Sequence, residues 1–380
     1  MPPEDLDRLV ERMVDGSEQS RRQFIRHLAG AGLLLGPGSA FLAACGGVKG
    51  ESAGKKVATA VHHPKVPIGD WTFSNWPLYI DKSVLKSFDK KYGGHVKYVE
   101  DINDNFEFFG KVRQQLSAKR PIGRDIVVLT DYMAARWVRD GFVTAIDKKN
   151  VPNAKNLVSG LQTIGYDPKK TGRKLNSIKD FFDPKFKGRV SFLSEPYDSA
   201  GMVMLMQGVD SSNAKLDQIM TAIDKIESAQ KAGQIRRFTG NDYTTDLTKG
   251  NLWVAMAYSG DIAGLQADNP NLEFVYPDEG SMIFTDNMMM PAKVAHPYAA
   301  ETMMNYVYDP QVAAKLAQAI YYISPVEGAE QIIQQSDPKL ASNPLLFPSA
   351  EIRKRFHPYP TLSPADERAM EERMAKVTGA

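Results

Sequence analysis

The chain contains a single cysteine, Cys45, which closes the sequence Leu42-Ala43-Ala44-Cys45. Without a second cysteine, no disulfide can cross-link the fold internally, so the free energy of folding must come from burial of apolar side chains. A chain of 380 residues is long enough to bury the cores of two lobes. The cysteine usage therefore excludes a disulfide-stapled scaffold and favours a large fold held together by its cores.

Two short patterns lie at and before Cys45. Ser20-Arg21-Arg22-Gln23-Phe24-Ile25 resembles a twin-arginine export signal, and Leu42–Cys45 resembles the site at which a signal peptidase cuts before a lipid-bearing cysteine. The segment 28–44 between them is apolar but broken by glycine and proline, and a spanning helix needs about 20 continuous apolar residues. The alternative is an N-terminal core helix that carries paired arginines.

We therefore expect residues 1–44 to be a signal peptide and Cys45 to be the lipidation site. This predicts export by the twin-arginine route and a location in the periplasm or at the outer face of the cell membrane. The protein would then contact the membrane through its lipid anchor only.

The net charge excludes some classes of partner. From residue 45 onward the chain holds 42 Lys and Arg against 39 Asp and Glu, a formal charge of +3. This excess is too small to indicate nucleic-acid binding or a polybasic membrane patch, so selectivity for charge must come from a local site.

The segment after Cys45 has the composition of a linker. Residues 46–65 are rich in Gly, Lys and small side chains without periodicity, so we assign 45–67 to a flexible tether. His62 and His63 lie in it with no cluster of other potential ligands nearby in sequence. We expect both imidazoles to be solvated rather than bound to a metal.

Beyond the tether, short apolar runs alternate with segments of helical spacing. Strands are predicted at 96–99, 125–129, 189–193, 252–258 and 273–276. Helices are predicted at 106–118, 133–139, 199–206, 299–308, 311–320 and 366–377. This alternation indicates an α/β fold with mainly parallel sheets, whose ligands bind at the carboxyl ends of the strands.

Common catalytic signatures are missing from the sequence. It has no Gly-x-x-x-x-Gly-Lys-Ser/Thr loop, no Gly-x-Ser-x-Gly elbow and no His-Glu-x-x-His, and its six histidines are scattered. This argues against the common hydrolases and metalloenzymes, and we expect no catalytic residue, cofactor or metal.

Six segments occur in an order that is typical of one protein family. They are Ser74–Tyr79, Asp125–Tyr132, Asp183–Val190, Tyr258–Asp261, Tyr276–Gly280 running to Asp286-Asn287, and Tyr322–Pro325. Through them the chain from about Ile68 to its C-terminus resembles the spermidine/putrescine-binding proteins of bacterial ABC transporters.

The resemblance implies a two-lobed periplasmic-binding-protein fold of type II, with hinge-linked lobes that each contain a mixed, mainly parallel sheet. One lobe would comprise 68–161 and 286–322, and the other 165–285 and 323–380. The ligand would lie in the cleft between them.

The resemblance also implies ten ligand-binding residues, namely Trp76, Tyr79, Thr130, Tyr132, Glu195, Asp198, Tyr258, Phe284, Asp286 and Tyr322. Glu195 and Asp198 occupy positions that hold an ammonium group in the family, while Tyr258 and Phe284 stand where tryptophan is frequent. The chemistry agrees, because ammonium groups leaving water need carboxylates, and aromatic faces pack methylenes and attract cations.

Taken without the family, these residue types have ordinary structural interpretations. Asp198 precedes a helical segment and could be its N-cap. Glu195-Pro196 and Asp286-Asn287 could form turns, and Tyr258 and Phe284 could be core aromatics.

One stretch departs from the family. Residues 161–166 are short where relatives carry a strand that crosses between the lobes and lines the cleft. We therefore expect the crossover strand to be missing, with a wider cleft, weaker closure or impaired folding.

These expectations converge on a lipid-anchored substrate-binding component of an ABC transporter, which captures putrescine or spermidine and delivers it to the permease. Lobe closure around the ligand would be the signal that the permease reads. We expect a monomer and no nucleic-acid partner. The alternatives are a receptor for another solute, such as ferric ion bound by Tyr321 and Tyr322 or a different organic cation, a tethered enzyme, and a degenerate scaffold without transport function.

Overall fold

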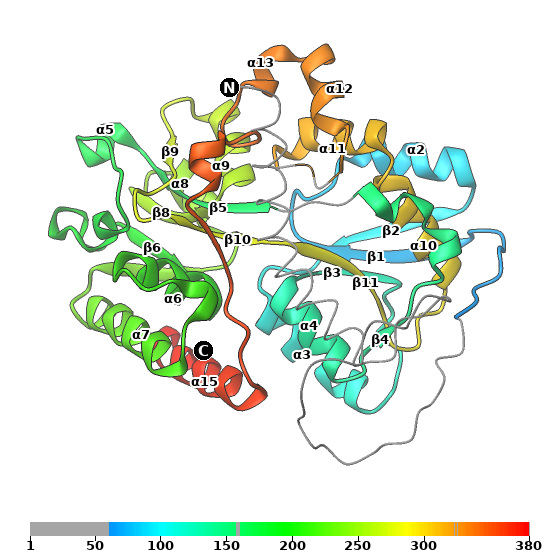
Figure 1. Cartoon of the computed structure of the whole chain (residues 1–380), viewed down its shortest axis with the longest axis horizontal. Coiled ribbons are helices and arrows are strands. Elements are labelled where there is room, and N and C mark those ends of the chain that lie inside the picture. Colours follow the sequence, from blue (N-terminus) through cyan, green and yellow to red (C-terminus); the bar gives the residue numbers. More distant parts are fainter. Residues whose placement is uncertain (1–60, 157–159, 323, 325, 380) are drawn as a thin grey trace, which may run out of the picture.

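The computed structural model describes residues 61–156, 160–322, 324 and 326–379, which form two α/β lobes side by side (Figure 1). The predictions for residues 1–44 and for Cys45 lie outside the described residues. Within the described ranges, no helix combines the length and the apolar character needed to cross a membrane.

The first lobe is built on a sheet of strand order β2-β1-β3-β11-β4. Its strands are β1 (Asp70–Asn75), β2 (His95–Glu100), β3 (Ile126–Thr130), β4 (Val143–Thr144) and β11 (Asp286–Pro291). Its helices are α2 (Lys82–Tyr92), α3 (Asn105–Ser117), α4 (Asp131–Arg139), α10 (Pro297–Val307), α11 (Pro310–Ile320), η1 (Lys148–Asn150) and η2 (Pro152–Asn156). α12 (Ala329–Ser336) packs on α11 through small apolar side chains.

The second lobe is built on a sheet of order β12-β10-β5-β8-β6-β7, with β9 paired to β5. Its strands are β5 (Gly160–Tyr166), β6 (Val190–Leu193), β7 (Ile235–Thr239), β8 (Val254–Tyr258), β9 (Glu273–Val275), β10 (Ser281–Phe284) and β12 (Phe356–Pro358). Around it lie α5 (Pro168–Thr171), α6 (Pro196–Met206), α7 (Leu216–Lys231), α8 (Tyr243–Thr248), α9 (Ser259–Asp268) and α15 (Pro364–Thr378). Shorter pieces are η3 (Ile178–Phe182), η4 (Pro184–Phe186), η5 (Ser211–Asn213) and α14 (Ala350–Arg353), whereas α13 (Pro338–Ala341) packs on α12.

Local sequence explains why the elements near the cleft begin where they do. All five residues of β3 are buried, as its unbroken Ile-Val-Val-Leu run predicts. Asp104 caps α3 by accepting from the backbone N–H groups of Phe106 and Glu107. α4, α6 and α9 start at or close behind the ends of β3, β6 and β8, so their first turns face the space between the lobes.

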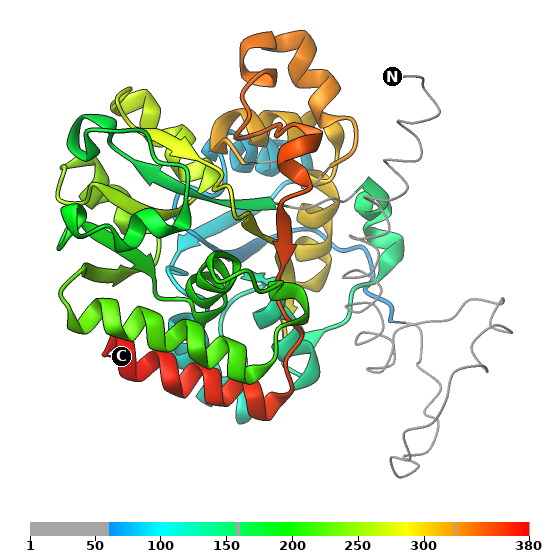
Figure 2. The same cartoon turned by 60° about the vertical axis from the view of Figure 1, so that its left-hand side comes forward.

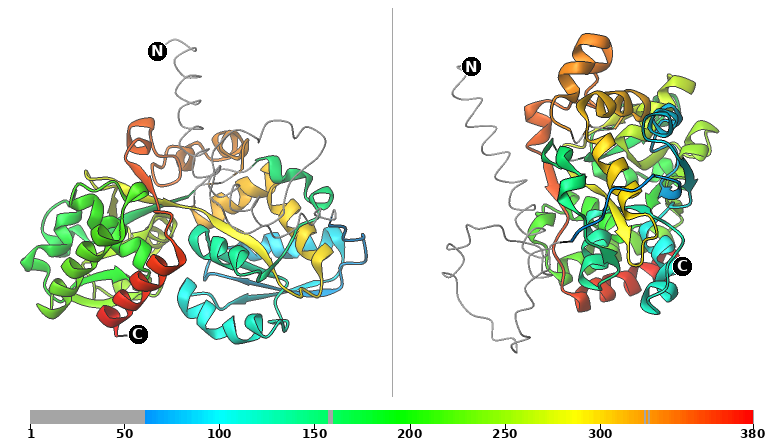
Figure 3. Two further views of the ribbon diagram at one scale, coloured as in Figure 1. Left: turned by 60° about the horizontal axis from the view of Figure 1, so that its bottom comes forward. Right: turned by 90° about the vertical axis from the view of Figure 1, so that its right-hand side faces the viewer.

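One nearly continuous strand joins the two sheets. β10 ends at Phe284 in the second sheet and β11 begins at Asp286 in the first, with only Thr285 between them. The yellow ribbon that runs from one lobe to the other in Figures 1 and 3 is this connection. Because it belongs to both sheets, residues at the crossing have a fixed place at the boundary of the lobes.

The predicted strands and helices are present, with ends that differ by a few residues. The sheets are mixed, as expected, but parallel pairing does not predominate: five of the ten described strand pairings are antiparallel. β11 and β5 account for the antiparallel pairings, since each runs against its neighbours. The residue limits proposed for the lobes stay a prediction.

The expectation that residues 161–166 lack the crossover strand is wrong. β5 spans Gly160–Tyr166 and pairs antiparallel with β8, β9 and β10 in the interior of the second sheet. Gly165 permits tight packing there, because a Cβ atom at this position would lie 2.3 Å from Cδ1 of Ile262. The strand is therefore part of the core. The shortness of this stretch relative to the family did not indicate whether a strand was present.

The expectation that His62 and His63 are solvated is also wrong for His63. Its Nδ1 lies 2.6 Å from Oε1 of the buried Glu301, and its side chain is only 15% exposed. Nδ1 of His62 lies 3.2 Å from Oδ2 of Asp147. The last part of the predicted tether is thus docked on the first lobe, because Glu301 needs partners once it is buried.

The lobes touch closely at Gly240, which follows β7 in the second lobe. A Cβ atom on Gly240 would lie 2.2 Å from the carbonyl oxygen of Asn103, which precedes α3 in the first lobe. Its φ is not in the left-handed region, so alanine fits the local backbone but not this interlobe contact.

We predict that Gly240→Ala keeps both lobes folded but prevents them from closing to the distance seen here. Small-angle X-ray scattering should show a larger radius of gyration than for the unmodified chain, with little change in thermal unfolding temperature. Gly264→Ala in α9 is the matched control, since a Cβ there meets nothing within 4 Å. Equal scattering for both variants would contradict the assignment of Gly240 to closure.

Candidate functional site

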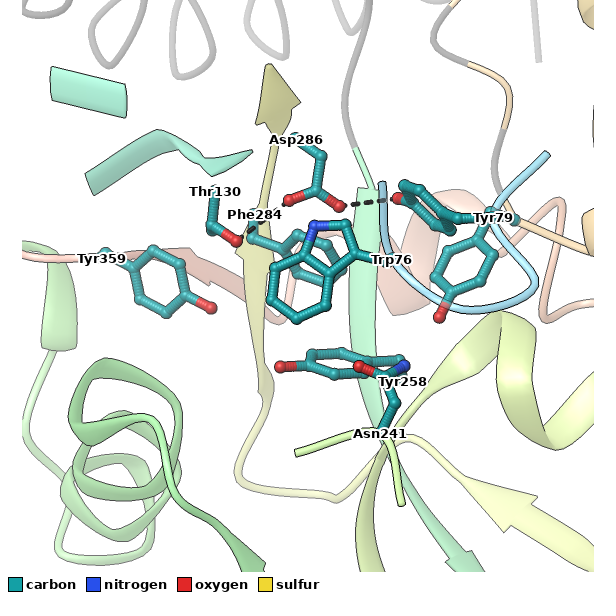
Figure 4. Close-up of a pocket in the computed structure, with 9 residues that line it drawn as sticks. Trp76, Tyr79, Thr130, Asn241, Tyr258, Phe284, Asp286 and Tyr359 are labelled. Carbon is teal, nitrogen blue, oxygen red and sulfur yellow. Dashed lines mark hydrogen bonds between the residues drawn. The ribbon is translucent and has the colours of Figure 1, made fainter. Parts of the chain in front are cut away.

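A narrow cavity lies between the lobes at the crossing of β10 into β11 (Figure 4). The centre of a water molecule can occupy only about 20 Å³ within it, so side chains nearly fill the space. Its lining residues are Trp76, Tyr79, Thr130, Asn241, Tyr258, Phe284, Asp286, Tyr322 and Tyr359. Seven of the ten residues predicted from the sequence are among them.

The first lobe contributes a loop after β1 and the end of β3. Trp76 is fixed by a hydrogen bond from its indole Nε1 to the carbonyl oxygen of Val128, at 3.0 Å. Leu78 follows with a φ of 59°, an uncommon value for a residue with a side chain, and lets the loop turn so that Tyr79 also reaches the cavity.

The crossing strand contributes Phe284 and Asp286. Oδ2 of Asp286 accepts a hydrogen bond from the hydroxyl of Tyr79 at 2.7 Å, and Oδ1 accepts one from the hydroxyl of Thr130 at 3.0 Å (Figure 4). Removal from water raises the pKa of Asp286, and the two hydroxyl donors offset part of that rise. The alternative that Asp286-Asn287 forms a turn is wrong, because both residues belong to β11.

The second lobe holds a buried carboxylate, Asp261, that the sequence prediction missed; it does not line the cavity but contacts two residues that do. Asp261 lies in the first turn of α9 and accepts hydrogen bonds from Tyr243 at 2.5 Å, Asn241 at 2.9 Å and Tyr322 at 2.8 Å. Removal from water raises its pKa, against the effect of these donors. Asp261 ends the family-like segment Tyr258–Asp261 and follows a buried strand. Its position just after the strand could therefore have marked it as a candidate ligand-binding residue.

Tyr132, Glu195 and Asp198 do not line the cavity but form a buried cluster beside it. Glu195 accepts from the backbone N–H of Asn105 at 2.6 Å, from the side-chain amide of Asn105 at 3.0 Å, and from the hydroxyl of Tyr132. Because Asn105 and Tyr132 belong to the first lobe and Glu195 to the second, this carboxylate connects the two lobes.

Asp198 accepts hydrogen bonds from the hydroxyls of Tyr258, at 2.9 Å, and Tyr359. It lies within the first turn of α6, whose N-cap position is Glu195 and whose first residue is Pro196. The alternatives of Asp198 as the N-cap and of Glu195-Pro196 as an ordinary turn are therefore wrong.

The aromatic residues surround the cavity from several elements. The rings of Tyr258 and Phe284 meet edge to face with centroids 5.4 Å apart, and those of Tyr79 and Tyr322 do so at 4.9 Å. Tyr359, which the sequence prediction missed, enters from the segment after β12 and meets the ring of Tyr132 at 5.4 Å. No local motif marks Tyr359, since only the path of the C-terminal segment brings it here.

Among the residues that the structure describes, no cationic side chain pairs with Glu195, Asp261 or Asp286. Their hydrogen bonds come from hydroxyl and amide groups. Burial also raises the pKa of Glu195 well above its usual value, with Asp104 and Asp198 adding repulsion. Such a site favours a bound cation or protons, because either one relieves the cost of an isolated buried negative charge.

We predict that the free energy of unfolding falls as pH rises from about 5 to 8. Ordinary carboxyls titrate near pH ~4, whereas the folded state retains protons on groups with raised pKa values, so stability present at low pH is lost as pH rises through those values. Urea denaturation of the chain over this range measures the slope.

Asp261→Asn should make this slope shallower, by up to about 1.4 kcal/mol per pH unit, the limit for one proton. Asp278→Asn is the control, since that side chain is 67% exposed. A slope of zero, or one that Asp261→Asn leaves unchanged, would contradict the assignment.

Comparison with known proteins identifies relatives over most of the chain. The putrescine-binding periplasmic protein SpuD of Pseudomonas aeruginosa (strain UCBPP-PA14) is 25% identical, over 80% of this chain and 90% of its own length. The putrescine-binding periplasmic protein PotF of Escherichia coli (strain K12) is 26% identical over the same shares.

The fold also has a solved counterpart. The spermidine/putrescine ABC transporter substrate-binding protein PotD of Streptococcus pneumoniae superposes with a TM-score of 0.65 at 18% identity, over 82% of this chain and 99% of the other. The two-lobed fold that the sequence resemblance predicts is therefore confirmed. The family model of bacterial extracellular solute-binding proteins matches residues 83–348, and the chain accordingly belongs to this family of binding proteins rather than enzymes.

Proposed function

We propose that the protein captures an aliphatic diamine or polyamine, such as putrescine or spermidine, in the cavity between its lobes. The observation that carries this proposal is the set of buried carboxyl groups Glu195, Asp261 and Asp286, none of which forms an ion pair with a cationic side chain in the described part of the chain. The names of the relatives, which include putrescine-binding proteins, support the same ligand class.

The ligand's ammonium groups would replace the protons that otherwise neutralise these buried carboxyl groups. Asp286 on the crossing strand and Asp261 in the second lobe would each accept from an ammonium group, in charge-assisted hydrogen bonds. The rings of Trp76, Tyr258 and Phe284 would pack the methylenes and attract the charge, each cation contact being worth ~0.5–2 kcal/mol. The ten residues predicted from the sequence, with Asn241, Asp261 and Tyr359 added, are the proposed site.

The small free volume requires movement on binding. A diamine cannot enter a cavity that leaves the centre of a water molecule only about 20 Å³, unless the tyrosine hydroxyls turn away from the carboxyls or the lobes separate. We propose that the lobes open about the β10–β11 crossing and the other connections, then close on the ligand.

We predict that the chain binds putrescine or spermidine with micromolar or tighter affinity, about −8 kcal/mol or stronger. Calorimetric titration after unfolding and refolding, which removes carried-over ligand, measures it. Asp261→Asn and Asp286→Asn should each weaken binding about 10- to 100-fold through loss of a charge-assisted hydrogen bond, while Asp278→Asn should not.

The same titrations should show tighter binding as pH rises from 5 to 8, because amines stay protonated while the ligand must displace protons from carboxyls with raised pKa values. Buffers of different ionisation enthalpy count the protons released. No heat with any polyamine, from chain shown to be folded, would rule out this ligand class.

We further propose that the protein is exported by the twin-arginine route, anchored by lipid at Cys45 and serves an ABC-transporter permease as a monomer. The motif around Arg21 and Arg22 and the single cysteine support this proposal.

Cys45→Ser is expected to move the protein from the membrane fraction to the soluble exported fraction, and Arg21→Lys with Arg22→Lys to retain it inside the cell. Fractionation with immunoblotting distinguishes the two effects. Membrane association of Cys45→Ser equal to that of the unmodified protein would refute the anchor.

A ferric receptor is the other function that the sequence left open. Of the two tyrosines that suggested it, Tyr322 donates to Asp261, and the described residues contain no group of three or more His, Cys, Asp or Glu side chains arranged to hold a metal ion. No observation favours this function over binding of an organic cation.

A further inference from the structure

The C-terminal helix α15 contacts both lobes outside the cavity. Its buried Met370, Met374 and Val377 pack it on the second lobe, where it lies along α7 (Figure 2). Arg373 strengthens this attachment, with Nη2 at 2.7 Å from Asp224 and 2.9 Å from Glu227 of α7. α15 therefore moves with the second lobe.

The adjoining face of α15 carries carboxylates that reach the first lobe. Oε1 of Glu371 lies 2.6 Å from Nη1 of Arg136, and Oε2 of Glu367 lies 2.6 Å from Nη2 of Arg139. Both arginines belong to α4 of the first lobe, and Figure 3 shows α15 at the junction of the lobes.

The Arg136–Glu371 ion pair is largely buried and well positioned, unlike an ion pair between exposed side chains. The two side chains are only 12% and 22% exposed, and the Arg136 guanidinium also lies over the ring of Phe109 in α3, 4.6 Å from its centroid. Arg136 is thus held in place by its own lobe, so little of its side-chain entropy is lost when the pair forms.

The same helix links this pair to the cavity region. Tyr132 and Arg136 are four residues apart on α4 and so share one face of the helix. Tyr132 stacks on Tyr197 of the second lobe with centroids 4.3 Å apart and donates to Glu195, while Arg136 meets Glu371 one turn further on. Opening the lobes would break these contacts together.

We propose that Arg136 and Glu371 are positioning residues for ligand capture, whose ion pair stabilises the closed arrangement of the lobes from outside the cavity. The part of this inference that concerns ligand affinity rests on the proposed function. The effect of the ion pair on lobe closure does not rest on the proposed function, so closure and ligand affinity can be tested separately.

The test measures the closed fraction of the ligand-free full chain by single-molecule fluorescence transfer. With Cys45 replaced by serine, dyes are attached to Lys111→Cys in α3 and Lys231→Cys in α7, whose side chains are 55% and 72% exposed. Measurements at pH 8.5 keep the carboxylate ionised, because burial raises the pKa of Glu371 to about 7.

Arg136→Glu and Glu371→Arg should each lower the closed-to-open ratio about tenfold, since each leaves two like charges facing across the junction. The combined charge swap should recover most of the loss, which a merely structural defect in either helix would not. Arg373→Glu is the matched control, because its ion pairs lie within the second lobe and should affect unfolding but not closure.

Polyamine titration of the same variants is the second readout, with an expected loss of affinity that follows the loss of closure. If the unmodified chain binds no polyamine, the fluorescence measurement still decides the inference. Single variants that close as well as the unmodified chain, or a charge swap that recovers nothing, would overturn it.

Discussion

The arrangement of the lobes depends on carboxyl groups that are enclosed at their boundary and held by neutral donors. Glu195 accepts from Asn105 and Tyr132 of the opposite lobe, and Asp286 accepts from Tyr79 and Thr130. A hydroxyl or amide donor satisfies a lone pair but does not cancel a charge, so these groups keep raised pKa values. Hydrogen bonds to Glu195 therefore join the lobes together with the ion pairs between α15 and α4, and the enclosed carboxyl groups remain responsive to a cation.

The strand that crosses from β10 into β11 holds an aromatic residue and a carboxyl group at the boundary of the lobes. Phe284 and Asp286 are two residues apart, yet one belongs to the sheet of the second lobe and the other to that of the first. An aromatic face and a carboxylate are thereby fixed side by side where the lobes meet. A loop could carry the same residues, but a strand paired in both sheets holds them with less freedom.

The sequence predicted the fold class, five of the twelve described strands and six of the fourteen described α-helices, because apolar periodicity and buried runs such as β3 are local signals. It also indicated seven of the residues that line the cavity. Of these, Trp76 follows a strand, Thr130 and Tyr258 end one, and Asp286 begins one. The wrong predictions concern features that depend on contacts between residues far apart in the chain. The equal share of antiparallel pairing, the presence of β5 and the docking of His63 on Glu301 all depend on partners distant in the chain.

The sequence by itself determined the residue types that a cation site requires, the single cysteine and the alternation of strands and helices. Only the tertiary structure decided which of those residues share one cavity. Tyr359 joins it from a segment 161 residues beyond its partner Asp198, while Glu195 and Tyr132 lie beside it as a contact between the lobes. The physical reason is that periodicity reports which face of an element is buried, whereas the partner of a buried polar group is chosen by the packing of whole elements.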